Sequence, residues 1–409
     1  MSELAPWQTA WPAGVVLLGL VLGALWSVRQ RQAVGPRVWL ARCFVFGLAL
    51  VVRLVVLPAL SAHVYDGHEA EYWDIFRGVR DLGRGGTVLY PSMQWLWWGL
   101  GRVLPHAPWV PVVLMAGVGA AGAVLVGMAA REVGGARAAV VAGVLVALHP
   151  IHAAWSSSAY NVVLPSTLMV LSLWTILRSC GQHRLHPGPI LLGASAAGLA
   201  VLTRLETVLL VPIHVLVLVL WTPDGISGRR ALRRLGPVAV VALPVVAVTL
   251  AGVWPLVFPG EVPGAGERAL SFCINKLWLA PFWPWDGVEM LAVAAAAVLA
   301  VRVRPAVGGP LLLGVVVVHL TMASFDDYAD RHALMVLPWL AVLVGLAVQG
   351  RWGRWGTGLA AGLVVVELWG LGDLRTRYYG DEDVFVASLA ADPALADLPR
   401  VDAQSARVD

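Results

Sequence analysis

Long apolar segments recur along the chain, and they constrain its fold more than any other feature. One of them, residues 38–60, reads VWLARCFVFGLALVVRLVVLPAL. A helix that crosses a membrane needs about 20 mainly apolar residues, whereas the strands of a membrane barrel alternate in shorter segments of about ten residues. Of the 409 residues, 59% are hydrophobic and only 13% are charged, against about 25% charged in soluble proteins. We therefore predict an all-α polytopic membrane protein.

The apolar segments divide into about twelve predicted membrane spans by the rule of roughly 20 residues per crossing. This division depends most on a break within LTRLE, residues 202–206, because a single kinked span there would reverse the orientation of everything that follows. The first segment has no basic residue before it and no cleavage site after it, so we interpret it as a retained helix and not as a signal peptide. The predicted spans are residues 13–28, 38–60, 110–130, 138–153, 160–178, 190–204, 207–222, 237–256, 287–302, 309–323, 332–350 and 355–371.

Arginine marks alternate loops between the predicted spans. Because positively charged loops generally stay in the cytoplasm, we expect the opposite loops to face the periplasm of a bacterial inner membrane. Two of these outer loops, residues 61–109 and 257–286, are rich in tryptophan and are expected to form helices at the membrane interface. The arginines of the cytoplasmic set are Arg29, Arg31, Arg37, Arg131, Arg137, Arg178, Arg184, Arg229, Arg230, Arg233, Arg234, Arg302, Arg304, Arg351 and Arg354.

Residues 1–371 thus form one predicted transmembrane domain, followed by a polar outer tail, residues 372–409, that is too short to bury a core of its own. The formal net charge of +4 indicates no nucleic-acid partner, because the arginines are scattered among short loops. The sequence predicts no cofactor. His149 and His152 have a ligand-like spacing, but no matching pair lies close in the sequence, so a divalent metal has no support beyond that spacing.

The most polar part of the first outer loop, HVYDGHEAEYWDIFRG at residues 63–78, directly follows a predicted span. On a helix, Asp66 and Glu69 would share one face, and Tyr72 would lie one turn after Glu69. Charged groups near a bilayer are costly and indicate function. The same residues equally suit a solvated helix start, so the residues alone leave both interpretations open.

Cationic side chains are expected on the same outer side. Arg204 and Glu206 lie in LTRLE and suit either an ion pair at a tight turn or a guanidinium that binds a phosphate. Arg331 and His332 lie in SFDDYADRHALMVLPWL, and Lys276, the single lysine of the chain, lies in the fourth outer loop. Each alone suits a structural role, but together they place carboxylates and cations on one face of the membrane.

Four stretches of the sequence, in their order along the chain, resemble the GT-C superfamily of polytopic membrane glycosyltransferases. The resemblance is to the bacterial relatives of protein O-mannosyltransferases and of lipid A aminoarabinose transferase. The stretches are RLVVLPAL followed by DGHEAEYW, then HPIHAAWSSSAYNVVLPSTLMVLSLW, then GLAVLTRLETVLLVP, and finally DRHALMVLPWLAVLVGLA. They cover residues 38–350, and the first predicted span looks like an addition ahead of the family core.

The resemblance implies an inverting glycosyltransferase that moves a sugar from a polyprenyl-phosphate donor to a cell-envelope acceptor on the periplasmic face. In that family an acidic residue of the first outer loop is the general base, which implies Asp66 here, with Glu69 as its partner. The family usually has adjacent Asp-Glu before the tyrosine, where this sequence has His68 and Glu69. The base therefore remains open between Asp66 and Glu69.

The resemblance also implies two further groups of site residues. The fourth stretch, DRHALMVLPWLAVLVGLA, is here called the late motif. It has Arg331 and His332 where the family has Arg-Tyr, and this departure puts the role of His332 in doubt. The implied donor phosphate-binding residues are Arg331, His332, Arg204 and Lys276, and the implied substrate-binding residues are His68, Tyr72, Glu206, Tyr160 and Asn161.

Two other classes of protein remain open. A transporter or flippase for lipids or polysaccharides would place charge deep within the spans, and Arg53 is the clearest charge of that kind. A non-catalytic subunit of an envelope-assembly complex remains open because DGHEAEYW, here called the acidic motif, departs from the family pattern at His68.

Overall fold

The computed structural model is a bundle of helices, and no strand occurs in the part of the chain that it describes. That part comprises residues 19, 21–25, 35–60, 68–80, 91–107, 109–156, 162–180, 187–221, 233, 236, 239, 286–323 and 334–391. The helices, in chain order, are α2 (Pro36–Leu60), α3 (His68–Arg77), α4 (Pro91–Gly101), α5 (Trp109–Leu148), α6 (Pro150–Trp155), α7 (Val163–Cys180), α8 (Pro187–Thr203), η2 (Leu205–Leu210), α9 (Val211–Leu220), α12 (Asp286–Val303), α13 (Pro305–Ala323), α15 (Leu337–Ala347), η3 (Gly350–Trp352) and α16 (Gly353–Ala391).

Among the described residues, three segments are long and apolar enough to cross a membrane: Pro36–Val55, Trp109–Leu148 and Gly350–Gly372. Their outward faces are apolar as well, since Leu40 and Val55 of α2 are 70% and 72% exposed. A helix that is apolar all round suits a surface covered by lipid. The shorter apolar helices are Val163–Ser179, Gly188–Thr203, Glu206–Leu220, Leu291–Val303, Pro305–Val318 and Leu337–Ala347. The predicted all-α membrane fold is confirmed.

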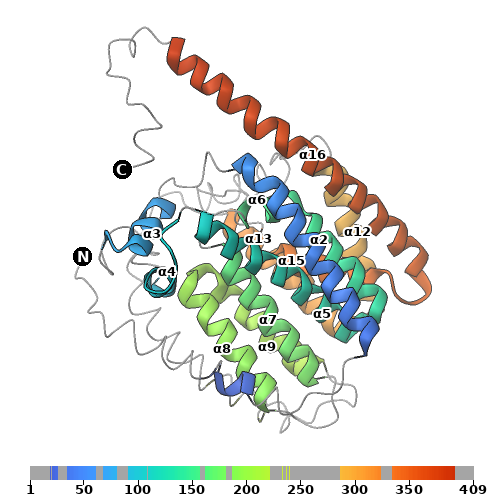
Figure 1. Ribbon diagram of the computed structural model, residues 1–409. Coiled ribbons are helices and arrows are strands. Elements are labelled where there is room, and N and C mark those ends of the chain that lie inside the picture. Colours follow the sequence, from blue (N-terminus) through green and yellow to red (C-terminus); the bar gives the residue numbers. More distant parts are fainter. Residues whose placement is uncertain are drawn as a thin grey trace, which may run out of the picture.

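α5 is a hairpin of two antiparallel arms that turns at Gly135, whose φ of 73° breaks the helix. A straight helix would separate residues 127 and 139 by about 18 Å. Here a Cβ added at Gly127 would lie only 2.8 Å from the carbonyl oxygen of Ala139. The two arms correspond to the predicted spans 110–130 and 138–153. α5 packs against α2, α7 and α15, which surround it in the bundle (Figure 1).

The predicted break within LTRLE is confirmed. Arg204 has extended backbone, with φ −153° and ψ 112°, between α8 and η2. The chain then turns back, because α9 packs beside α7, where the Ser172 hydroxyl lies 3.0 Å from Nδ1 of His214. Helices also occupy the predicted spans 287–302, 309–323 and 355–371, and α15 lies within the predicted span 332–350. The predicted span 237–256 lies almost wholly outside the described residues, so the total of twelve stays a prediction.

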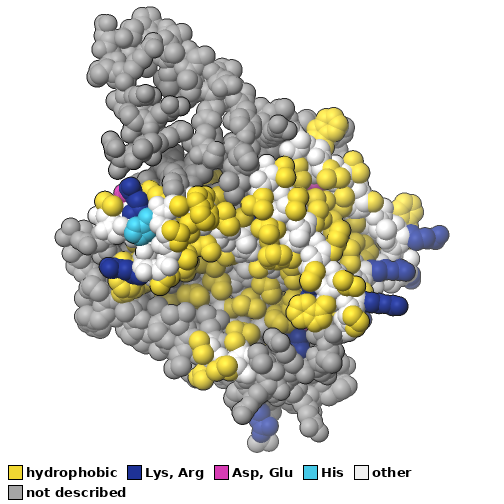
Figure 2. All heavy atoms as spheres, viewed as in Figure 1, with side chains coloured by type: hydrophobic (Ala, Val, Ile, Leu, Met, Phe, Trp, Pro, Cys, Tyr) yellow, Lys and Arg dark blue, Asp and Glu magenta, His cyan; other side chains and the backbone are white. Residues whose placement is uncertain are grey.

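Arginines from separate loops gather at one end of the bundle, here called the arginine end and defined by Arg37, Arg42, Arg131, Arg178, Arg302 and Arg351. Figure 2 shows several Lys or Arg side chains gathered along one edge of the molecule, on the side away from the α3 end. Arginines here lie over tryptophan rings, with centroid distances of 5.8 Å for Arg42–Trp39, 5.5 Å for Arg178–Trp174 and 5.2 Å for Arg351–Trp352. Tryptophan prefers the level of the lipid headgroups, so this end is expected to lie at a membrane surface.

The opposite end, here called the α3 end, carries α3, α4 and α6 (Figure 1). α16 reaches it from the arginine end, and a Cβ added at Gly370 would lie 2.7 Å from Cγ of Pro150 in α6. α16 then continues as helix to Ala391 and extends beyond the bundle (Figure 1). The α3 end therefore combines loop helices from the first half of the chain with the last helix.

Candidate active site at the α3 end

The acidic motif leads into α3, which begins at His68 and carries Glu69 in its first turn. Tyr72, one turn after Glu69, is completely buried. At the far end of the helix, Nη2 of Arg77 donates to Oδ1 of Asp74 at 2.9 Å. The predicted helical setting of Glu69 and Tyr72 is confirmed, while Asp66 lies outside the described residues.

Buried side chains from five separate stretches of the sequence meet at this end, and we call them the Tyr72 cluster. Val162 and Val163 directly follow Tyr160 and Asn161 in the sequence, and Leu334 lies two positions after His332 and three after Arg331. The cluster thus joins the acidic motif to the second and fourth of the family-like stretches. Its members are Tyr72, Ile75, Phe76, Met93, Trp97, Val110, Met115, Val162, Val163 and Leu334.

A polar contact reinforces the junction between two of these stretches. The hydroxyl of Ser166, on α7, donates to the carbonyl oxygen of Leu334 at 2.8 Å, across 168 positions of sequence, and Ser166 is buried. This bond fixes the start of α7 against the residues that follow the late motif. Arg331, His332, Tyr160, Asn161 and Lys276 themselves lie outside the described residues, so their roles stay predictions.

Arg204 forms the ion pair that its sequence neighbours suggested. Nη2 of Arg204 lies 3.2 Å from Oε1 of Glu206, and the two side chains are 3% and 23% exposed. The hydroxyl of Thr207 donates to the carbonyl oxygen of Arg204 at 2.7 Å and holds the turn. A partly buried pair of this kind favours the structural interpretation, and the predicted phosphate-binding role of Arg204 stays a prediction.

A buried polar network that the sequence did not predict links α2 to α6. Nη1 of Arg53 donates to the carbonyl oxygens of Ala49 at 2.7 Å and Ala147 at 3.3 Å, and Nη2 lies 2.6 Å from Nδ1 of His152. A guanidinium can only donate, so Nδ1 of His152 must accept and its proton sits on Nε2. Ser156 completes the network, its hydroxyl 2.5 Å from the His152 carbonyl oxygen and 3.1 Å from Nδ1.

The first histidine of HPIH, His149, connects this network to α16. Nδ1 of His149 accepts from the backbone N–H of His152 at 3.4 Å and caps α6. Its Nε2 faces Oε1 of Glu367 at 3.9 Å, and both side chains are nearly buried. The signal that could have revealed this network was Arg53 itself, because a charge inside a span needs a partner.

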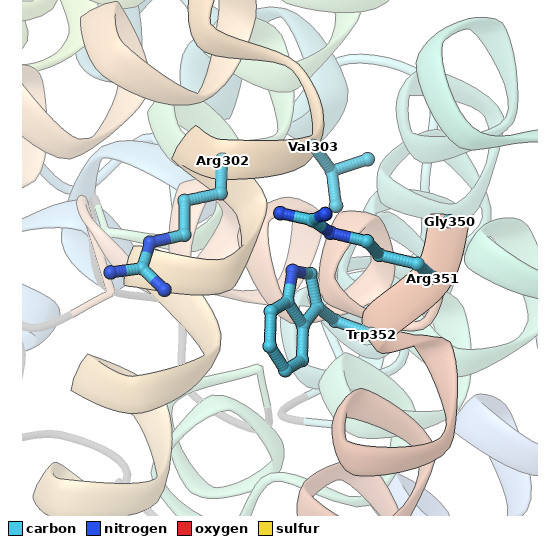
Figure 3. A pocket seen from close by; sticks show the side chains of 5 residues that line it. All are labelled: Arg302, Val303, Gly350, Arg351 and Trp352. Atoms are coloured by element: carbon cyan, nitrogen blue, oxygen red, sulfur yellow. The ribbon is translucent and has the colours of Figure 1, made fainter.

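The described residues offer no group of three His, Cys, Asp or Glu side chains placed to hold a metal ion. A hollow of about 500 Å³ does occur, but at the arginine end, lined by Arg302, Val303, Gly350, Arg351 and Trp352. Figure 3 shows Arg302, from the end of α12, and Arg351, from η3, at this hollow, with the Trp352 ring beside Arg351. The described lining of this hollow contains no carboxylate or histidine that could act as a general base.

Comparison with solved structures identifies the fold class as that of the GT-C membrane glycosyltransferases. The structure superposes on ArnT from Cupriavidus metallidurans bound to undecaprenyl phosphate with a TM-score of 0.55 and 22% identity, over 81% of this chain and 64% of that one. It superposes on the oligosaccharyltransferase of Archaeoglobus fulgidus, in complex with zinc and sulfate, with a TM-score of 0.54 and 15% identity, over 81% of this chain and 52% of that one. The resemblance drawn from the four sequence stretches is thereby confirmed at the level of the fold.

The chain spans less than two thirds of the length of either of these two solved proteins. No protein-family profile matches its sequence, and neither does any curated protein. The comparisons therefore establish a shared membrane fold, which is the starting point for a functional proposal.

Proposed function

We propose that this protein is a membrane glycosyltransferase that moves a sugar from a polyprenyl-phosphate donor to a cell-envelope acceptor, with inversion at the anomeric carbon. The observation that carries the proposal is the fold shared with ArnT bound to undecaprenyl phosphate. The convergence of the acidic motif with two other family-like stretches in the Tyr72 cluster supports it. The catalytic end is then the α3 end, which we place on the periplasmic side of the inner membrane because arginine-rich loops favour the cytoplasm.

The proposed reaction needs one base and several cations. Asp66 or Glu69 removes the proton of the acceptor hydroxyl, whose oxygen attacks the anomeric carbon from the face opposite the phosphate. The bond from that carbon to the phosphate oxygen breaks, and the polyprenyl phosphate leaves with the electron pair. A positioned base is typically worth about 10²–10⁴-fold in rate.

Negative charge gathers on the departing phosphate, and cations near it lower the barrier. Arg331, His332, Lys276 and Arg204 are the residues we assign to this role. Arg204 is already paired with Glu206 at 3.2 Å, so it would bind a phosphate only by sharing its guanidinium between two anions. Arg331 and His332 are the stronger candidates, because their segment continues directly into the Tyr72 cluster at Leu334.

The remaining assigned residues would contact the substrate. They are His68, Tyr72, Glu206, Tyr160 and Asn161. Tyr72 is completely buried in its cluster, its hydroxyl oxygen included, so in this structure its side chain packs against its neighbours and its contact with the substrate stays a prediction. Its first effect is to hold α3, and with it Glu69, against α4 and α7.

The test is turnover of radiolabelled polyprenyl-phosphate sugars by purified protein in liposomes. Wild type is compared with Asp66→Asn, Glu69→Gln and, as the matched control, Asp74→Asn. Asp74 is a carboxylate of the same segment, but it is engaged by Arg77 at 2.9 Å. We expect a fall of about 10²-fold or more in one of the first two variants, and near-normal turnover in the control.

Equal losses in all three variants would indicate disruption of α3 and would contradict the assignment of a base. If no donor turns over while labelled lipid moves between leaflets in the same liposomes, the protein is a transporter. If wild type neither transfers sugar nor moves lipid, the non-catalytic subunit is the better interpretation.

A further inference from the structure

A groove at the arginine end combines an apolar floor with a cationic rim. It lies between the first turns of α2 and the hairpin turn of α5 and has a volume of about 140 Å³. Its floor is formed by apolar and small side chains, among them Val38, Ala41, Val45 and Val124, whereas its charged rim consists of Arg37, Arg42 and Arg131.

The groove opens toward the lipid. Val140, on one wall of the groove, is 42% exposed. Trp39 and Leu40, which lie between the lining residues Val38 and Ala41 on α2, are 53% and 70% exposed. The floor follows α2 from residue 38 to residue 45, which is about 10 Å of helix at 1.5 Å per residue. An extended hydrocarbon chain that lies along α2 would therefore cover apolar surface over this whole length.

The rim carries an excess of positive charge. Arg42 lies close enough to Arg131 and Arg178 for their charges to repel, and the carboxylate beside them is Glu132. Glu132 is itself engaged, since Oε1 accepts from Nε1 of Trp174 at 3.3 Å. Like charges held together at the mouth of an apolar groove favour an anion there.

The depth of the rim agrees with a lipid headgroup. The Arg42 guanidinium lies over the Trp39 ring at 5.8 Å, and tryptophan prefers the interface between lipid and water. A basic pocket between membrane helices is the kind of site that recognises anionic headgroups. The hollow at Arg302 and Arg351 has no comparable apolar floor.

We propose that this groove binds an anionic glycerophospholipid, with its phosphate at Arg42 and Arg131 and one acyl chain along the α2 floor. A soluble phosphate would leave the floor uncovered, and a zwitterionic lipid would bring its own cation to the rim. The site lies at the opposite end of the bundle from α3, so it is distinct from the proposed catalytic site.

The test measures lipid binding to the delipidated protein by native mass spectrometry. Phosphatidylglycerol is compared with phosphatidylcholine of identical chains, and with undecaprenyl phosphate and free glycerol phosphate. We expect phosphatidylglycerol to bind most tightly. The double variant Arg42→Gln/Arg131→Gln should weaken it by about 25-fold, or about fivefold for each guanidinium lost.

Two further variants test the groove itself. Arg137→Gln removes an exposed arginine from the same hairpin that does not line the groove, and it should leave binding unchanged. Ala41→Trp fills the floor without changing any charge, and it should weaken phosphatidylglycerol while leaving the thermal stability of the protein near that of wild type.

Several results would overturn the proposal. Equal losses in Arg137→Gln and the double variant would show diffuse attraction to charge. Unchanged binding of phosphatidylglycerol to Ala41→Trp would show that the acyl chain does not lie in the groove. Tighter binding of undecaprenyl phosphate, or equal binding of phosphatidylcholine, would refute the choice of an anionic glycerophospholipid.

Discussion

Nη2 of Arg53, on α2, lies 2.6 Å from Nδ1 of His152, on α6, and both side chains are buried. The contact joins residues 99 positions apart. α2 leads toward the acidic motif, and α6 leads toward Tyr160 and Asn161. The pair therefore joins α2, where the first family-like stretch begins, to α6, which lies near the start of the second.

Replacement of Arg53 should destabilise the protein. Arg53→Met leaves Nδ1 of His152 and the carbonyl oxygen of Ala147 without their donor, and a buried polar group that loses its partner costs about 1–3 kcal/mol. Arg53→Lys should recover only part of the loss, because one ammonium cannot reproduce the planar fork of the guanidinium. Thermal unfolding in detergent measures both, with the exposed Arg137→Gln as control. A melting temperature for Arg53→Met equal to that of the control would contradict this role.

His149 and Glu367 should be energetically coupled. Their facing atoms are 3.9 Å apart and join α6 to α16. His149→Asn keeps a side chain that can cap α6 but removes the ring that faces the carboxylate, and Glu367→Gln removes the charge alone. We expect the double variant to be more stable than the sum of the two single effects predicts, by about 0.5–1.5 kcal/mol. Strictly additive effects in the double-mutant cycle would show that the two residues do not interact.

The spans were predictable because hydropathy and loop charge both report directly on a membrane. The break at Arg204 was supported only by the alternation of arginine-bearing loops, and its extended backbone confirms it. The continuation of α16 to Ala391 was not predicted, since the residues after 371 are polar and a search for apolar spans stops there. Helix formation does not require an apolar sequence, whereas a membrane span does.

The candidate site was predictable only in outline. The helical setting of Glu69 and Tyr72 follows from local spacing. The hydrogen bond between Arg53 and His152 does not, because tertiary packing decides which of many distant groups meets a buried guanidinium. The sequence did contain half of the signal, because an arginine inside a span needs a partner, but nothing in the sequence identified His152 as that partner.

Gly135 should be required for the hairpin of α5. Its φ of 73° and ψ of −164° lie in a region of backbone conformation that is essentially restricted to glycine, and a residue with a Cβ adopts it at a cost of about 1–3 kcal/mol. Gly135→Ala should therefore lower stability by about that amount. Gly117→Ala, in the first arm of the same hairpin, meets nothing within 4 Å and should be neutral or slightly stabilising. Paired unfolding curves measure both changes, and a stabilised Gly135→Ala protein would show that the turn tolerates a side chain.

The hydrogen bond from Ser166 to Leu334 should matter for catalysis if the late motif holds the donor phosphate. Ser166→Ala removes the 2.8 Å bond that fixes α7 against the residues after Arg331 and His332. The loss of one such bond, at about 1 kcal/mol, corresponds to about a fivefold fall in turnover of the polyprenyl-phosphate sugar. Ser166→Thr keeps the hydroxyl and should restore most of the rate.

Ser179→Ala is the matched control for this prediction. Ser179 lies on the same helix and is also buried, but its hydroxyl donates at 2.8 Å to the carbonyl oxygen of Thr175 within α7. Its removal leaves the contact between α7 and the late motif intact, so turnover should stay near that of wild type. Measurement of kcat and KM for the three variants separates the effects. If Ser179→Ala slows the reaction as much as Ser166→Ala, or if Ser166→Thr restores nothing, the rate depends on the integrity of α7 and not on its link to Leu334.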